Sequence, residues 1–339
     1  MKKILITGGL GFIGVNTSLK LAEQGFRCYL LDNFYRKESK KNLALVENNK
    51  NIIFLEQDIT QIKETEKLIK ENKYFAILNF AGQVAMSRSL ENPLNDFNIN
   101  AYGSLGILES IRKYSLNTLY LYTSTNKVYG DLSWDTIKTL NSRYESKDNK
   151  YGYDVDIPID LSTPYGCSKG IADLYAIDYF KSFGLKTCVL RLSTIYGTNQ
   201  ASTYDQGWIG WFIKESILNK NNDLINVLGN GKQVRDILFI DDLVQLIISL
   251  LGHPEAFKGL KYNVGGGYNN SISINELISR LEIKLKKKLK LKPSKERTSD
   301  QKYYVSNIKD LKKQLSWYPR INIDQGLDMY IDFIKKNYE

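Results

Sequence analysis

The feature that most constrains the fold of this chain is a glycine-rich turn directly after its first apolar segment. Residues 2–7 (KKILIT) have the character of a buried strand, and an amphipathic stretch reaching about residue 24 follows the turn. Glycines three residues apart allow a tight turn and let the backbone approach a ligand closely. The free N–H groups at the start of a following helix favour an anion such as a phosphate. The residues predicted to bind a ligand here are Gly8, Gly11, Phe12, Ile13 and Gly14.

Strand-like and helix-like segments alternate through the first half of the chain. Alternation of this kind is typical of a parallel sheet covered by helices on both faces. We therefore predict an α/β fold with a doubly wound parallel sheet, the Rossmann fold. The further apolar runs are 27–31, 51–55, 75–80, 116–122 and 186–192, and the helix-like segments lie near 14–24, 61–72, 93–114 and 164–183.

The pattern changes after about residue 193, where the segments become shorter and Gly and Asn cluster. This change predicts a smaller, substrate-binding domain interleaved in sequence with the first, because 237–251 is expected to return to the main sheet. Residues 131–163 are polar and weakly periodic, which indicates an excursion from the core. We expect a dinucleotide-binding domain of residues 1–193 plus about 237–255, and a smaller domain of residues 194–236 and 256–339.

An acidic residue ends the second strand-like run: Asp32 lies eighteen residues after Gly14. A carboxylate at this place can bind the ribose hydroxyls of an adenine dinucleotide and repels a 2′-phosphate, which favours NAD over NADP. Arg36 and Lys37 follow closely and leave NADP as an alternative. The ends of the third and fourth strand-like runs are expected to contact the same cofactor. The cofactor-binding residues predicted on these strand ends are Asp32, Asn33, Asp58, Ile59, Phe80, Ala81 and Gly82.

A tyrosine and a lysine one helical turn apart supply the candidate acid–base group. Tyr165 and Lys169 lie on the same face of the predicted helix 164–183. A neighbouring ammonium group lowers the pKa of a phenol, so Tyr165 is expected to take a proton from an alcohol while Lys169 also holds the nicotinamide ribose. Tyr-x-x-x-Lys alone is common, and a surface pair is the alternative.

Hydroxyl groups follow the fifth strand-like run, at Ser124 and Thr125. There they can hydrogen-bond a reacting sugar oxygen and align it with Tyr165, or they can simply cap backbone groups. The glycine turn, the acidic strand end, the hydroxyl pair and Tyr-x-x-x-Lys occur in the order that an NAD-dependent enzyme requires. We therefore predict that Thr125, Tyr165 and Lys169 are catalytic.

The chain resembles, over essentially its whole length, the extended short-chain dehydrogenase/reductase family of nucleotide-sugar-modifying enzymes. Within it the chain is most similar to the CDP-paratose 2-epimerases, also called CDP-tyvelose epimerases. The segments that carry this resemblance are 81–86 (AGQVAM), 124–131 (STNKVYGD), 164–170 (PYGCSKG), 203–212 (TYDQGWIGWF) and 229–236 (GNGKQVRD). The resemblance implies NAD as cofactor, a nucleotide-sugar substrate such as a CDP-3,6-dideoxyhexose, and a homo-oligomer (dimer or tetramer) formed through the helices 93–114 and 164–183. The substrate-binding residues it implies are Gln83, Ser124, Thr125, Arg235 and Arg297, with the two arginines on the diphosphate.

The resemblance implies epimerisation at C2 through a transient 2-keto sugar. Related dehydratases need a carboxylate pair directly after the strand-end hydroxyl, where this chain has Asn126 and Lys127. Dehydration is therefore not expected. The alternatives are a C4 epimerase, an NAD-dependent dehydrogenase or reductase of another nucleotide sugar, and a non-catalytic nucleic-acid-binding relative.

The composition of the chain argues against three further classes of protein: nucleic-acid-binding, metal-dependent and membrane proteins. The net charge of +10 comes from lysines scattered over helix faces, which favours a solvated surface over a nucleic-acid site. Three cysteines and the single His253 fit no zinc spacing and no Ser-His-Asp triad, so we predict no metal. No apolar run is long enough for a membrane span or a signal peptide, so a cytoplasmic location and no membrane partner are expected.

Overall fold

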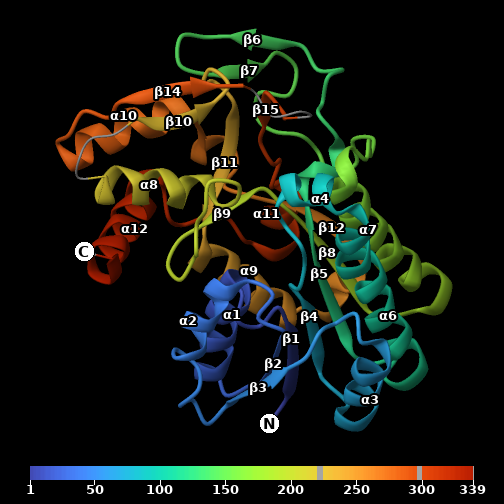
Figure 1. Cartoon of the computed structure of the whole chain (residues 1–339). Coiled ribbons are helices and arrows are strands. Elements are labelled where there is room, and N and C mark those ends of the chain that lie inside the picture. The colour runs from blue at the N-terminus through green and yellow to red at the C-terminus, as the bar shows by residue number, and fades with distance from the viewer. Residues whose placement is uncertain (220–223, 296–299, 339) are drawn as a thin grey trace. The chain divides into compact units, whose positions relative to one another are not determined.

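The computed structural model describes residues 1–219, 224–295 and 300–338, and these form two compact units (Figure 1). Unit 1 consists of Met1–Val128, Thr163–Arg191 and Leu243–Tyr262. Unit 2 consists of Tyr129–Ser162, Leu192–Asp242 and Asn263–Glu339. The units are interleaved in sequence.

Unit 1 is built on a seven-stranded sheet with the order β12-β8-β5-β4-β1-β2-β3. β1 pairs in parallel with both β2 and β4, so the strand order reverses between β1 and β4. This order confirms the predicted doubly wound α/β fold, in which ligands bind beyond the carboxyl ends of the strands at the reversal. The strands are β1 (Lys3–Thr7), β2 (Arg27–Asp32), β3 (Ile52–Glu56), β4 (Ala76–Asn79), β5 (Leu119–Thr125), β8 (Thr187–Leu192) and β12 (Lys258–Val264).

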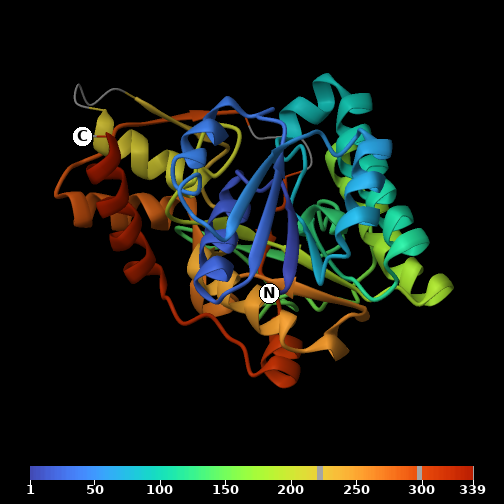
Figure 2. The ribbon, with the colours of Figure 1, turned by 90° about the horizontal axis from the view of Figure 1, so that it is seen from below.

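Helices cover both faces of this sheet. Buried side chains of α3 (Ile62–Asn72), α6 (Gly103–Tyr114) and α7 (Thr163–Phe183) form one hydrophobic core with the central strands. Figure 2 shows α1 (Phe12–Glu23) on the other side of the strands. The predicted segment 93–114 is one continuous run of helix, made of α5 (Pro93–Phe97), a π-helical turn (Asn98–Tyr102) and α6. The predicted helices and strands of the first half are thus confirmed.

Unit 2 contains short strands and peripheral helices. β11 (Val234–Phe239) pairs with β9 (Thr194–Tyr196), β13 (Ser271–Ser273) and β15 (Tyr303–Tyr304). β10 (Ile225–Leu228) pairs in parallel with β14 (Leu291–Ser294), and β6 (Ile137–Thr139) pairs antiparallel with β7 (Tyr144–Ser146). The helices are α8 (Trp208–Leu218), α10 (Ile274–Leu285), α11 (Lys309–Leu315) and α12 (Ile323–Tyr338).

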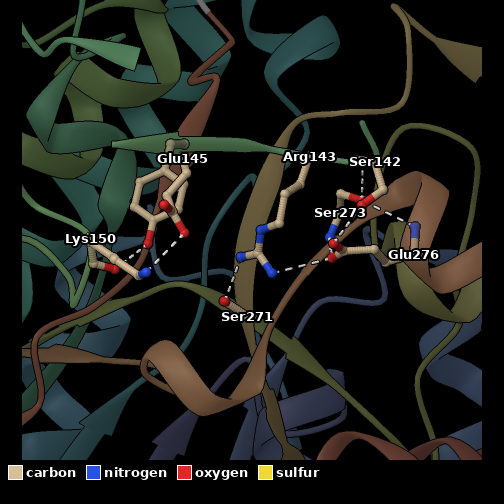
Figure 3. Close-up of polar contacts among 8 residues, drawn as sticks. Ser142, Arg143, Glu145, Lys150, Ser271, Ser273 and Glu276 are labelled. Atoms are coloured by element: carbon tan, nitrogen blue, oxygen red, sulfur yellow. Dashed lines mark hydrogen bonds and ion pairs between the residues drawn. The ribbon is translucent and has the colours of Figure 1, made fainter. Parts of the chain in front are cut away.

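The β6–β7 hairpin is tied to the start of α10 by polar contacts (Figure 3). Ser273 and Glu276 form a capping box, in which each side chain bonds the backbone N–H of the other. Ser142 donates to one carboxylate oxygen of Glu276 at 3.0 Å, and Arg143 pairs with the other at 3.4 Å. Arg143 also donates to Ser271 Oγ at 2.7 Å. The residues that cap the helix therefore also anchor the hairpin.

The expected domain boundaries differ from the structure in three main places, at residues 129–162, 237–242 and 256–262. Residues 129–162 were expected in the first domain but belong to unit 2, because Tyr144 N bonds Lys232 O and Tyr153 N bonds Val305 O, each at 2.8 Å. The strand of 237–251 was expected in the main sheet, yet β11 pairs within unit 2. The seventh strand of the main sheet is instead β12, and only the second part of α9 (Ile240–Leu251) belongs to unit 1.

Within the described ranges, no helix is both long and apolar enough to cross a membrane.

Candidate active site

The glycine turn joins β1 to α1 by a close approach of backbone to backbone. Gly8 has a φ of +63°, a conformation that favours glycine, and Gly11 N bonds Gly8 O at 2.9 Å. A Cβ atom on Gly14 would lie 2.3 Å from Gly8 O, and one on Gly8 would lie 2.8 Å from Ala81 N. No side chain caps the N-terminus of α1. The first N–H groups of α1 are therefore open to an anion, and the turn has the form that a pyrophosphate requires.

Asp32 lies beside this turn, at the end of β2. Its carboxylate accepts hydrogen bonds from Leu10 N at 3.2 Å and Phe34 N at 2.9 Å. Burial raises the pKa of Asp32, and the backbone hydrogen bonds oppose that effect. Asn33 Nδ2 donates to Asp58 Oδ2 at 2.6 Å, which joins the loops after β2 and β3. The structure thus brings the predicted ribose-binding acid and the predicted adenine-side residues together.

The loop after β4 lies between the glycine turn and α7. Phe80 N bonds Thr7 O at 3.2 Å, and Ala81 N bonds Thr7 Oγ1 at 3.3 Å. A Cβ atom on Gly82 would lie 3.6 Å from Lys169 Nζ. Phe80, Ala81 and Gly82 thus lie between Thr7 and Lys169, and their contact with a cofactor stays a prediction. Ile59 differs, because its side chain is buried in the hydrophobic core and only its backbone is left for a ligand.

Thr125, Tyr165 and Lys169 meet at the carboxyl end of β5. The Thr125 hydroxyl lies close enough to the phenol of Tyr165 to lower the pKa of that phenol. Lys169, one turn further along α7, is only 3% exposed, and its Nζ lies 4.4 Å from the ring centroid of Tyr122. The Ser124 hydroxyl is buried without a hydrogen-bond partner among the described residues.

The pKa values of Tyr165 and Lys169 differ from the prediction. Burial raises the pKa of Tyr165 to about 12, and the hydrogen bond from Thr125 only partly opposes it. Burial lowers the pKa of Lys169 to about 7. The expectation that Lys169 lowers the pKa of the phenol is therefore wrong, because burial has the largest effect on this pKa and Lys169 is not among the groups that act on it.

Gln83 belongs to a buried polar cluster of Gln83, Asp96, Asn100 and Ser168. Its Nε2 donates to Ala85 O and to Asp96 Oδ1, both at 2.8 Å, and its Oε1 accepts from Ala85 N at 2.7 Å. Both amide hydrogens of Gln83 are thus used inside the protein, which leaves it to position the loop after β4 rather than to donate to a substrate. Asp96, Asn100 and Ser168 were not predicted, although Asp96 and Asn100 stand four residues apart in a helical segment, a spacing that places them on one face.

Arg235 lies in unit 2 and is held from several sides. Its Nη1 donates to Val234 O and Gln301 O at 2.7 Å, and its Nη2 pairs with Asp300 at 2.6 Å. Arg297 lies outside the described residues.

The comparisons with known proteins agree with this geometry. Residues 5–330 match the model of the GDP-mannose 4,6 dehydratase family. The chain belongs to this family. CDP-paratose 2-epimerase of Salmonella typhi is 39% identical to it over 98% of each chain. UDP-glucuronate 4-epimerase of Thermodesulfobacterium geofontis is 30% identical over 99% of this chain and 97% of its own.

Among solved structures, dTDP-glucose 4,6-dehydratase of Bacillus anthracis in complex with NAD superposes with a TM-score of 0.83. It is 25% identical, and the match covers 100% of this chain and 98% of that one. The predicted family and enzyme class are confirmed, and NAD is confirmed at the level of the family. Because members of this family carry out both epimerisation and dehydration, the residues of each site decide the reaction.

Proposed function

We propose that this protein is an NAD-dependent nucleotide-sugar epimerase that converts CDP-paratose to CDP-tyvelose by inverting C2. The observation that carries the proposal is that Thr125 at the end of β5 lies beside the phenol of Tyr165, with Lys169 one turn further along α7. The positions after Thr125 are Asn126 and Lys127, which cannot supply the carboxylate pair of a dehydratase. The 39% identity to the CDP-paratose 2-epimerase of Salmonella typhi supports the choice of sugar and carbon.

The residues of unit 1 fit the cofactor. The glycine turn and the uncapped start of α1 hold the pyrophosphate, and Asp32 takes the adenosine ribose. Bound NAD would supply reversible hydride transfer at the reacting carbon of the sugar. Lys169, beside Gly82 in the loop after β4, is placed to hold the nicotinamide ribose.

Tyr165 moves the proton. Tyr165 accepts the proton of the sugar 2-hydroxyl as a phenolate, and the phenol formed returns this proton after the 2-keto sugar has rotated within the site. Thr125, which lies close enough to act on the pKa of this phenol, orients the sugar oxygen, and Ser124 is proposed to bind the sugar beside it. Since burial raises the pKa of Tyr165, the phenolate needs a nearby positive charge, and we assign this role to Lys169, one turn further along α7.

Arg235 and Arg297 are proposed to bind the diphosphate of the substrate. A guanidinium group has five donors, and Arg235 uses Nη1 and Nη2 inside unit 2. Arg235 therefore has limited capacity for phosphate and contributes mainly charge.

A second candidate function is inversion at C4. The 30% identity to a UDP-glucuronate 4-epimerase favours it, and the same three catalytic residues would serve.

The test is a substrate panel of CDP-paratose, UDP-glucuronate, UDP-glucose and dTDP-glucose, with products identified by NMR. We expect inversion of CDP-paratose at C2 and no turnover of the UDP sugars. Inversion of UDP-glucuronate at C4 without reaction of CDP-paratose would select the second candidate.

A further inference from the structure

Asp96, at the centre of the buried cluster, is a carboxylate whose hydrogen-bond donors are all neutral. It is fully buried in α5. Its Oδ2 accepts from the Ser168 hydroxyl, and its Oδ1 accepts from Gln83 Nε2 at 2.8 Å and Asn100 Nδ2 at 3.3 Å. A buried charge is costly unless hydrogen bonds and an opposite charge compensate it. The hydrogen bonds of Asp96 are present, so the remaining question is which cation balances it.

Lys169 is the matching buried cation. Its neighbour along α7, Ser168, bonds Asp96 directly. Gly82 borders both groups, since a Cβ atom there would lie 2.9 Å from Asn100 Oδ1 and 3.6 Å from Lys169 Nζ. The ammonium group of Lys169 therefore lies at the edge of the buried cluster.

Asp173, the other carboxylate that acts on Lys169, already has a partner. Both of its oxygens bind Arg191, at 2.8 and 3.0 Å, and this pair is buried. The ring of Tyr122 lies beside Lys169, and Tyr165 lies one turn away on α7, but burial raises the pKa of both phenols, so neither supplies a negative charge near pH 7. Among the described residues, Asp96 is thus the carboxylate near Lys169 that has no arginine partner.

We propose that Asp96 is the counter-charge of Lys169, which keeps this lysine protonated in its buried position, and that its bond to Ser168 fixes the turn of α7 that carries Tyr165 and Lys169. Asp96 acts through Lys169 and is a positioning residue. This proposal depends on the proposed function only where it predicts an effect of Asp96 on turnover.

The pKa of Lys169 agrees with this assignment. Burial lowers it to about 7, and the charge of Asp96 acts in the opposite direction. A lysine with such a pKa loses its proton as the pH rises through 7, so any loss of counter-charge neutralises it at physiological pH. Asp96→Asn removes the charge at constant size, and the Ser168 hydroxyl can accept a hydrogen bond from the new amide.

The test is an NMR titration of the full chain labelled with ε-¹³C-lysine, in which the Lys169 signal is identified by its loss in Lys169→Met. We expect Asp96→Asn to lower the titration midpoint of Lys169 by about one pH unit. Ser168→Ala keeps the charge and should move the midpoint much less. Asp178→Asn, which removes an exposed charge from the same helix, should leave it unchanged. An unchanged midpoint in Asp96→Asn, or an equal shift in Asp178→Asn, would overturn the proposal.

A second measurement does not depend on the folding of Asp96→Asn. Asp96→Glu keeps the negative charge, so the titration midpoint of Lys169 should stay close to its native value in this variant. A midpoint lowered by about one pH unit in Asp96→Glu would also refute the pairing.

Turnover provides a separate readout. The activity of Asp96→Asn relative to the native enzyme should rise as the pH falls, because Lys169 regains its proton. A native protein without epimerase activity would refute the proposed function, while the two titrations would still decide the role of Asp96.

Discussion

At the residue scale, turnover depends on the phenol of Tyr165. Tyr165→Phe removes the only proposed acceptor for the sugar proton and preserves the packing of the ring. We expect kcat to fall by roughly 10²–10⁴-fold, the usual contribution of general acid–base catalysis. The bound NAD, measured after denaturing the purified protein, should stay near the native amount. Activity close to that of the native enzyme would refute the role given to the phenol.

Asp32 is predicted to select NAD over NADP. Asp32→Ala removes the carboxylate that is proposed to bind the ribose and to repel a 2′-phosphate. NAD affinity should fall by about 1.5–3 kcal/mol, the range for a hydrogen bond to a charged group, and NADP affinity should fall less. Asp32→Asn is the matched control of equal size, and isothermal titration calorimetry measures both cofactors. Equal losses of affinity for NAD and NADP would mean that Asp32 does not bind the ribose.

The sequence predicted some site residues and missed others for a physical reason. Tyr165 and Lys169 are one helical turn apart, so their proximity is local and can be seen in the sequence. Asp96 bonds Ser168, 72 positions away, and such a contact exists only once α5 packs against α7. The family resemblance implied Gln83 as a substrate-binding residue, and nothing in the sequence reveals that Asp96 and Ala85 take both of its amide hydrogens.

At the scale of elements, the cofactor site depends on the close contact of α1 with the glycine turn. Gly14→Ala would place a Cβ atom 2.3 Å from Gly8 O and 2.8 Å from Gly9 Cα. Because both are backbone atoms, α1 must move, and we expect a loss of about 1–3 kcal/mol in stability together with loss of bound NAD.

Gly25→Ala is the control for this substitution. Gly25 has a φ of +82° and no atom within 4 Å of the added Cβ, so strain alone should cost about 1–2 kcal/mol. Thermal unfolding should therefore show destabilisation in both variants, with bound NAD retained only in Gly25→Ala. Native NAD content in Gly14→Ala would contradict the role given to the turn.

The sequence could predict the strands that are buried along their length, but not β12. β1, β4 and β5 are buried, and their continuous apolar runs are typical of parallel strands. β12 was missed because its first half is polar and only partly buried, as in KGLKYNV. The place of 129–162 in unit 2 depends on backbone bonds to residues such as Lys232 and Val305, which no local pattern encodes.

At the scale of the whole molecule, exposed apolar side chains on α5 and α7 support the expected homo-oligomer. Leu94, Phe97, Leu174 and Tyr175 are all exposed, and α5 packs against α7. We predict that the protein is at least a dimer and that Leu174→Glu shifts it toward the 38.9 kDa monomer in native mass spectrometry. Leu140→Glu, at a similarly exposed leucine in unit 2, should leave the mass unchanged. A monomeric native protein would refute this prediction.

The central claim is that Tyr165 and a retained NAD invert one sugar carbon without exchange with solvent. The most direct test is incubation of the enzyme with CDP-paratose in H₂O and in D₂O, with the configuration and isotope content of C2 followed by NMR. The account predicts inversion at C2 with no deuterium on that carbon, because the hydride that leaves C2 is the one that returns. Deuterium at C2, inversion at another carbon, or release of NADH with the ketone would contradict it.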